Sequence, residues 1–180
     1  MRLKSSLLLA ATLLVSSVAS VTAAENRTGL ANLNKVTSYG GLNFGSKFPA
    51  WRYQIEQNRG DLKIYRKFGQ NHLMGPLHLD DVLYYAFQGK FYGVAFHTND
   101  GENSALLQTI LVNAFGRGNN EAHGGSTINW SGNKIGLIYD ENKSTGEANA
   151  FLFDERLHEA CLTYQESAAQ VAAQSLIKGK

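Results

Sequence analysis

The chain has 180 residues, of which 43% are hydrophobic and 18% are charged, and its formal net charge at pH 7 is +2. This composition excludes an intrinsically disordered chain, because enough apolar side chains are present to build a core. Arg2 and Lys4 supply the positive excess, so the rest of the chain is formally neutral. A neutral chain lacks the surplus of Lys and Arg that binding several phosphates requires, and we expect no nucleic-acid partner.

Residues 1–24 have the three parts of a secretory signal peptide. Arg2 and Lys4 form a basic start, an apolar run covers 7–15, and small residues lead up to Ala23 and Ala24. The apolar run is shorter than the roughly 20 residues of a transmembrane helix, which disfavours the alternative of a membrane anchor. We expect cleavage near Ala23 or Ala24 and a soluble mature chain in the periplasm or outside the cell, not an integral membrane protein.

The mature chain is expected to hold a polar leader over 25–40 and a single domain over 41–180. A short helix carrying Phe48 and Trp51 is expected near the start of the domain. Cys161 is the only cysteine. Internal disulfide bonds therefore cannot form, and core packing must stabilise the domain.

The domain is expected to contain strands and helices in the order strand–strand–strand–helix, repeated once. Alternation of apolar and polar residues predicts strands, whereas apolar residues three or four positions apart predict helices. The strands are expected at 62–68, 77–87, 91–98, 127–130, 134–139 and 148–153. One helix is expected over 103–115, and a second opens at Asp154 and continues to the end of the apolar pattern at Leu176.

The second helix is predicted to be a core element, because its apolar stripe keeps helical spacing from Leu157 to Leu176. Cys161 lies on this stripe, with His158 three positions before it. A thiol nucleophile needs a partly exposed setting with an activating charge. We therefore favour a buried structural Cys161 over a catalytic pair of His158 and Cys161.

These elements predict an α+β fold, an antiparallel meander with helices on one face, and two βββα halves are an open alternative. The phrase Gly-Leu-Asn-Phe-Gly-Ser at 41–46, followed by paired hairpins and a helix, resembles small uncharacterised exported domains of bacteria over 40–155. The element order is also similar to the saddle-like sheets of the β-lactamase-inhibitor-protein type. The resemblance implies an exported α+β domain and assigns no functional residue.

Two phrases resemble known sites without completing them. The run His-Gly-Gly-Ser at 123–126 is similar to the oxyanion-hole phrase of lipases, but the chain has no Gly-x-Ser-x-Gly elbow. Oxygen-bearing side chains alternate in 140–147, as calcium coordination requires, but Thr145 and Phe151 occupy the positions where an EF-hand needs Gly and Glu. A hairpin loop uses the same residues for turn geometry, and we favour that interpretation.

The densest group of possible acid, base and ligand residues is His78, Asp80 and Asp81, and His123 is the fourth residue considered with them. A hydrolytic enzyme with a site around these four residues is one alternative. Their spacing matches no zinc motif and no established catalytic arrangement. The sequence therefore predicts no catalytic, cofactor-binding or metal-binding set, and no cofactor.

Aromatic residues provide the remaining lead. Six of them crowd one expected hairpin around a Gln-Gly-Lys connection at 88–90, namely Tyr84, Tyr85, Phe87, Phe91, Tyr92 and Phe96. Strand alternation places them on both faces of the sheet, and an uncovered aromatic face is typical of a binding surface. We expect an exported non-catalytic domain that binds a partner protein, an envelope component or a small ligand through this face. A structural or assembly factor that forms a homodimer through its sheet is a further alternative.

Overall fold

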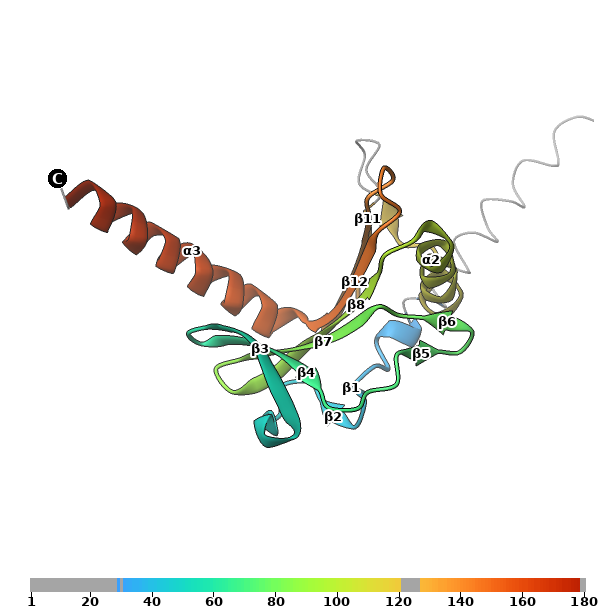
Figure 1. Ribbon diagram of the computed structural model, residues 1–180, viewed down its shortest axis with the longest axis horizontal. Helices are drawn as coiled ribbons and strands as arrows, with labels where there is room; N and C mark the ends of the chain where they lie inside the picture. The colour runs from blue at the N-terminus through green and yellow to red at the C-terminus, as the bar shows by residue number, and fades with distance from the viewer. Residues whose placement is uncertain (1–28, 30, 121–126, 179–180) are drawn as a thin grey trace, which may run out of the picture.

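The structure is a computed structural model that describes residues 29, 31–120 and 127–178. An eight-stranded antiparallel sheet dominates it, with two long helices, α2 (Gly101–Phe115) and α3 (Glu155–Lys178), in the described part of the chain (Figure 1). The predicted α+β antiparallel fold is confirmed. The predicted signal peptide (1–24) and the residue His123 lie outside the described residues.

The sheet consists of two antiparallel meanders that lie side by side. The first contains β3 (Tyr53–Arg59), β4 (Leu62–Lys67), β7 (Asp81–Phe87) and β8 (Lys90–Thr98). The second contains β12 (Ala148–Asp154), β11 (Ile135–Glu141), β10 (Ile128–Ser131) and β9 (Asn119–Asn120). The meanders meet where β8 pairs with β12, with Val94 opposite Leu152. Each meander is followed by one helix, as the sequence order predicted.

The segment around Phe48 differs from the expected short helix. The structure has only a 3-10 turn, η1 (Ala50–Arg52), after which the chain enters the strand β3. Phe48 is buried and packs against Tyr65 with ring centroids 4.5 Å apart, whereas Trp51 is 77% exposed. Residues 50–52 are all exposed, so a longer helix here would bury no further apolar side chain, and the chain extends into the sheet instead.

Two small hairpins pack beside the main sheet, β1 (Ser38–Tyr39) with β2 (Leu42–Asn43) and β5 (Leu73–Met74) with β6 (Leu77–His78). They include part of the segment that the sequence pattern placed in a polar leader. Leu33 is fully buried, and the ring of Tyr39 lies 5.2 Å from that of Phe96. The described residues before position 41 thus contribute directly to the core.

The connection between β7 and β8 contains two residues, since Phe87 pairs directly with Lys90. Gln88 and Gly89 have φ angles of 50° and 73°. These positive values are typical of the tight hairpin turn whose twist matches that of the strands. The hairpin is as predicted, but its turn is one residue shorter because Lys90 belongs to the strand.

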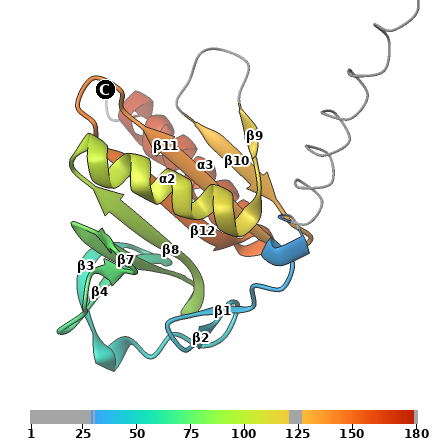
Figure 2. The same cartoon turned by 90° about the vertical axis from the view of Figure 1, so that its right-hand side faces the viewer.

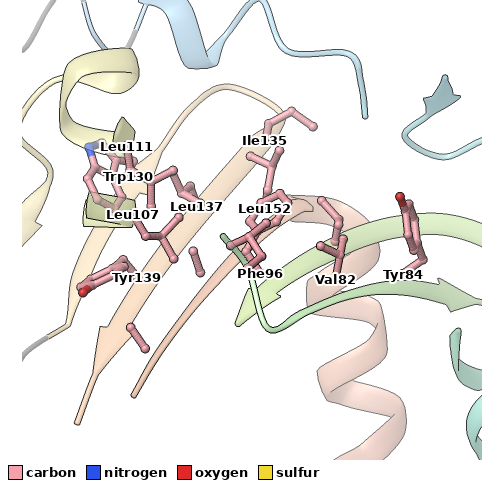
Figure 3. Close-up of a cluster of buried hydrophobic side chains, with 14 of the residues drawn as sticks. Val82, Tyr84, Phe96, Leu107, Leu111, Trp130, Ile135, Leu137, Tyr139 and Leu152 are labelled. Carbon is pink, nitrogen blue, oxygen red and sulfur yellow. The ribbon is translucent and has the colours of Figure 1, made fainter. Parts of the chain in front are cut away.

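The helix α2 covers one face of the sheet and completes the main core. Leu107 and Leu111 point from α2 towards Trp130 and Leu137 on the second meander (Figure 3). The side chain of Asp100 caps the helix by accepting a hydrogen bond from the Asn103 N–H at 2.8 Å. This face of the sheet is filled with buried side chains.

The helix α3 lies on the opposite face of the sheet (Figure 2). The expectation that both helices share one face is therefore corrected. The physical reason is that the sheet has apolar side chains on both faces: Leu152 belongs to the core with α2, whereas its neighbour Phe153 packs with Leu157 and Cys161 of α3. Asp154 caps the new helix by accepting the Leu157 N–H at 2.9 Å.

Only the first part of α3 packs on the sheet. Leu157 and Cys161 are buried against Phe87, Tyr92 and Phe153. Residues 165–177, here called the distal half of α3, are all exposed and project away from the sheet (Figure 1). The prediction of a core helix is thus confirmed for Leu157 and Cys161 and wrong for the region up to Leu176. None of the helices described here is both long and apolar enough to span a membrane.

Candidate functional site: an aromatic groove

A cavity of about 390 Å³ lies between the first part of α3 and the sheet face opposite α2. We call that sheet face the open face and the cavity the groove. Side chains from β3, β4, β7, β8, β12 and α3 line it, among them Arg59, Ile64, Tyr85, Tyr92, Phe151 and Leu162. Its volume is within the range of about 300–1,000 Å³ that is usual for small-molecule sites.

Three aromatic rings on neighbouring strands form the base of the groove. The ring of Tyr85 lies 4.9 Å from that of Phe151 and 6.0 Å from that of Tyr92, in edge-to-face geometry in both cases. Tyr92 reaches this face through a β-bulge, because the register between β7 and β8 shifts after Tyr85. Bulges often re-aim a side chain beside a functional site.

Two strand glycines make room for this aromatic cluster. A Cβ atom at Gly93 would lie 2.5 Å from the ring of Phe151, and one at Gly136 would lie 2.5 Å from the ring of Phe153. The two phenylalanine rings stack with centroids 5.1 Å apart. The absence of a side chain at Gly93 and Gly136 therefore fixes how deep the rings lie and keeps the groove open above them.

The helix side of the groove carries a thiol and an imidazole. The Tyr92 hydroxyl donates a hydrogen bond to Cys161 Sγ at 3.7 Å, and Gln165 Nε2 donates to the same sulfur at 3.8 Å. Burial raises the pKa of the Cys161 thiol, and the hydrogen bond from Tyr92 opposes this only in part. Cys161 is 1% exposed. A protonated, buried thiol is a packing group rather than a nucleophile, as the sequence pattern predicted.

His158 packs among the rings beside Cys161. Its ring centroid lies 4.3 Å from that of Phe153, and its Nδ1 atom is buried without a hydrogen-bond partner. Burial lowers the pKa of His158, and the nearby Glu159 opposes this effect. The imidazole is therefore neutral near pH 7 and contributes a polar but uncharged group to the groove wall.

The rim of the groove is polar and includes one cation. The guanidinium of Arg59 is close enough to the Tyr85 hydroxyl to oppose the rise in its pKa that burial causes, whereas Asp81 adds to that rise. Gln57 and Asn149 complete the polar lining on the sheet side. The arrangement combines an apolar aromatic base with neutral polar groups and one positive charge at its edge.

The residues of the predicted alternative hydrolytic site do not line this groove. His78 is exposed at the end of β6, Asp80 accepts the Asn99 N–H at 2.7 Å, and Asp81 pairs with Arg66 at 2.7 Å. Among the described residues, no group of three or more His, Cys, Asp or Glu side chains is placed to hold a metal ion. Asp80 and Asp81 each serve a structural contact next to the β7–β8 hairpin.

The oxygen-rich loop at 140–147 forms the hairpin turn between β11 and β12. Asn142 Oδ1 accepts the Ser144 N–H at 3.0 Å, and the Asn142 carbonyl accepts the Gly146 N–H at 2.8 Å. Asp140 accepts a hydrogen bond from the Thr127 hydroxyl at 2.7 Å. These oxygen atoms act as acceptors within the turn, which agrees with the turn interpretation.

The predicted aromatic hairpin is divided between the two faces of the sheet. Tyr84, Phe91 and Phe96 are buried in the main core on the α2 side of the sheet, and of the six hairpin aromatics only Tyr85 is partly exposed. Sequence reasoning missed the contributions of Phe151 and Arg59 to the groove. Two signals could have indicated them: the alternation of Asn149, Phe151 and Phe153 along one strand, and the glycines inside strands, which mark close approach of a bulky group.

Comparison with protein-family models, with curated proteins and with solved structures found no match. The resemblance to exported α+β domains that the sequence suggests stays a prediction.

Proposed function

We propose that the mature chain is an exported, non-catalytic binding domain and that the groove is its binding site. Export is supported by the order of basic, apolar and small residues in 1–24. The observation that carries the binding proposal is the cavity of about 390 Å³ with an aromatic base and a single cation at its rim. Concave sites that are mostly apolar, with a few polar groups at fixed positions, are the usual form of a ligand site.

The lining indicates which chemistry the groove accepts. Edge-to-face rings such as Tyr85 and Phe151 favour a flat or branched apolar group, since aromatic contacts add to the gain from burial. The guanidinium of Arg59 favours a carboxylate or sulfonate at the outer end of that group. The occupant we propose is therefore an apolar group with an anionic or polar end, presented by a small molecule or by a partner protein.

The geometry gives less support to the hydrolytic alternative. Asp80 and Asp81 are engaged in structural contacts, the imidazole and thiol beside the groove are both neutral, and the thiol is buried. A general base needs a proton-accepting group within reach of a substrate atom, and a nucleophile needs an activating neighbour.

The test uses anilinonaphthalene sulfonate, a fluorescent probe with a flat apolar body and one anionic group. Wild-type protein at low micromolar concentration should bind the probe and enhance its fluorescence. Arg59→Gln should weaken binding roughly tenfold, because a lost charged hydrogen bond is worth about 1.4 kcal/mol or more. Ala95→Trp, which fills the groove from β8, should abolish binding.

Matched variants outside the groove provide the controls. Arg52→Gln removes an exposed arginine that stacks on Trp51, with its Cζ atom 4.4 Å from the ring centroid. Ala105→Trp adds the same bulk at an exposed position of α2. Both should bind the probe as wild type does. If Arg59→Gln and Ala95→Trp bind the probe as well as their controls do, the groove is not the binding site.

A further inference from the structure

Exposed aromatic and basic side chains gather where β3 begins and β4 ends. Tyr53 at the start of β3 pairs with Lys67 at the end of β4, so their neighbours Arg52 and Phe68 lie at the same corner of the sheet. Trp51 is 77% exposed and Phe68 is 63% exposed. Large exposed apolar side chains that lie together tend to mark an interaction surface. We call Trp51, Arg52, Lys67 and Phe68 the Trp51 corner.

The Trp51 corner lies on a projecting edge of the molecule. Figure 1 shows the coil that leads into β3 at the lower edge, away from both α2 and α3. β3 is an edge strand of the sheet, and Ile55, which is 48% exposed, extends the apolar surface along it. Neither Trp51 nor Phe68 lines the groove. Protruding rings fit a partner that is soft enough to take them in, as the headgroup region of a lipid bilayer is.

The charges around the corner are mostly positive. The segment 44–70 contains six basic and two acidic residues. Of the two acids, Glu56 pairs with Arg66 at 3.4 Å, and Asp61 accepts a hydrogen bond from Gln88 Nε2 at 3.3 Å. The segment 140–166 has the opposite balance, with seven acidic and two basic residues. A negatively charged surface therefore attracts the corner and repels the second meander, and this orients the molecule.

The side chains of the corner suit the boundary between lipid and water. The Cζ atom of Arg52 lies 4.4 Å from the centroid of the Trp51 ring. Tryptophan rings are enriched at the headgroup level of bilayers, and the long stems of Arg and Lys follow apolar surface while their charges stay in water. The pair thus combines a ring that enters the headgroup region with a cation at the level of the lipid phosphates.

We infer that the Trp51 corner docks the exported protein on an anionic lipid bilayer, with the rings of Trp51 and Phe68 among the headgroups and with Arg52 and Lys67 on the lipid phosphates. The predicted signal peptide carries the chain across a membrane, so the mature protein is released beside such a surface. Two rings and a few cations give a reversible, interfacial attachment. The inference goes beyond the proposed binding function and does not depend on the groove.

Co-sedimentation of the mature protein with vesicles tests the inference. Vesicles of equal parts phosphatidylglycerol and phosphatidylcholine should bind wild type. Vesicles of phosphatidylcholine alone should bind it roughly tenfold less, because each cation near an anionic surface contributes about fivefold. Raising the salt concentration from about 0.1 M to about 0.5 M should weaken the binding to the anionic vesicles, because salt screens exposed charges.

Paired substitutions separate the rings from the charges. Trp51→Ser combined with Phe68→Ser should weaken binding to the anionic vesicles roughly tenfold or more, because two apolar rings no longer leave water. Leu176→Ser is the matched control, since Leu176 is 79% exposed on α3. It should bind as wild type does.

Arg52→Gln combined with Lys67→Gln should also weaken binding roughly tenfold. Lys134→Gln combined with Arg156→Gln removes the same charge from exposed positions beside the start of α3, and this control should bind as wild type does. All the substituted side chains are exposed, so the fold should remain intact, and urea denaturation verifies this.

Tryptophan fluorescence reports whether the corner itself enters the bilayer. Trp130 is 1% exposed and its indole N–H donates to the Gly116 carbonyl at 2.8 Å, so its emission should not change. Anionic vesicles should shift the emission of Trp51 to shorter wavelength. Trp51→Phe should show no such shift.

Three results overturn the inference: wild type that does not bind the anionic vesicles, wild type that binds both kinds of vesicle equally, or corner variants that bind as well as their controls. Wild type that ignores the vesicles but binds polyglutamate identifies an acidic protein as the partner in place of a membrane. The fluorescent probe is measured without vesicles, so the groove and the corner can each fail alone.

Discussion

The helices α2 and α3 each follow an antiparallel meander, yet they end in different environments. α2 has buried residues along its length, Ser104, Leu107 and Leu111. α3 has buried residues only at Leu157 and Cys161, near its start. The start of α3 crosses the ends of the strands, where it packs on Phe153, Tyr92, Phe87 and Leu62, and the rest of its 24 residues continue beyond the sheet. Helical periodicity specifies which side of a helix is apolar, but the size of the sheet decides how much of that side is covered.

The two faces of the sheet differ in the same way. The face beneath α2 is a continuous core in which Tyr84, Phe96 and Leu107 are each at most 3% exposed. The face beneath α3 contains a smaller cluster, and the groove remains between it and the helix. The first face stabilises the fold, whereas the second combines a small core with a surface available for binding.

The two faces of the sheet should differ most clearly in how much stability a substitution removes at the neighbouring residues Tyr84 and Tyr85. Tyr84→Ala removes a ring that is buried in the main core, on the α2 side of the sheet, and is only 2% exposed. The free energy of unfolding should fall by about 3–5 kcal/mol, as is usual for a large buried ring. Tyr85→Ala should cost clearly less, about 1–2 kcal/mol, because its ring borders the groove and is partly exposed. Urea denaturation of both variants measures the difference.

The same pair distinguishes binding from folding. Tyr85→Ala should weaken probe binding to the groove, while Tyr84→Ala, where it remains folded, should bind the probe normally. Equal and large losses of stability in both variants would mean that the hairpin is core on both faces, and the division between a stabilising and a binding face would then be wrong.

The fold could be predicted in outline because local patterns control its main elements. The alternation in 77–87 and 91–98 and the Gln-Gly turn specify the β7–β8 hairpin without reference to the rest of the chain. β3 was missed because exposed polar residues dominate it: every residue from Gln54 to Arg59 is exposed. A strand at the edge of the sheet that buries little carries no hydrophobic alternation to detect.

The groove depends on contacts that no local pattern contains. Arg59 and Phe151 are 92 positions apart in the chain and lie on strands that β4, β7 and β8 separate, so they line one groove only in the assembled sheet. The side of the sheet on which α3 packs depends on long-range contacts of Leu157 and Cys161 with Phe153, Tyr92 and Phe87, although α3 follows β12 directly. A sequence pattern can locate that junction but does not give the direction in which the helix leaves.

Leucine substitutions in the two helices test the same contrast in the free energy of unfolding with aliphatic side chains. Leu107→Ala in α2 should lower the free energy of unfolding by about 2–5 kcal/mol, because Leu107 is 0% exposed and the cavity left behind cannot be filled by solvent. Leu176→Ala in α3 should change it by no more than about 0.5 kcal/mol at low micromolar protein. A comparable loss at Leu176 under these conditions would indicate that the distal half of α3 packs within its own chain.

The smallest expected effect is the pH dependence that His158, on the α3 side of the sheet, gives to the free energy of unfolding. Burial holds the pKa of His158 below the value of 6.5 that applies in the unfolded chain. In the interval between the two pKa values the unfolded chain binds a proton that the folded protein does not, so the free energy of unfolding falls as the pH is lowered. Below the folded pKa the loss is complete and the contribution levels off. The total should stay below about 1 kcal/mol, because the ring is partly accessible to solvent.

The measurement compares wild type with His158→Phe in urea denaturation between about pH 7.5 and about pH 5.5. The phenylalanine ring preserves the packing on Phe153 but does not titrate, and the other histidines are common to both proteins, so the difference between the two curves isolates His158. Glu155, whose pKa is raised by burial and by Glu159 and Asp154, is also common to both proteins. Wild type should lose stability relative to the variant as the pH falls. If the two curves run parallel, His158 has the same pKa in the folded and the unfolded protein. Water then reaches the imidazole despite the burial of its Nδ1 atom.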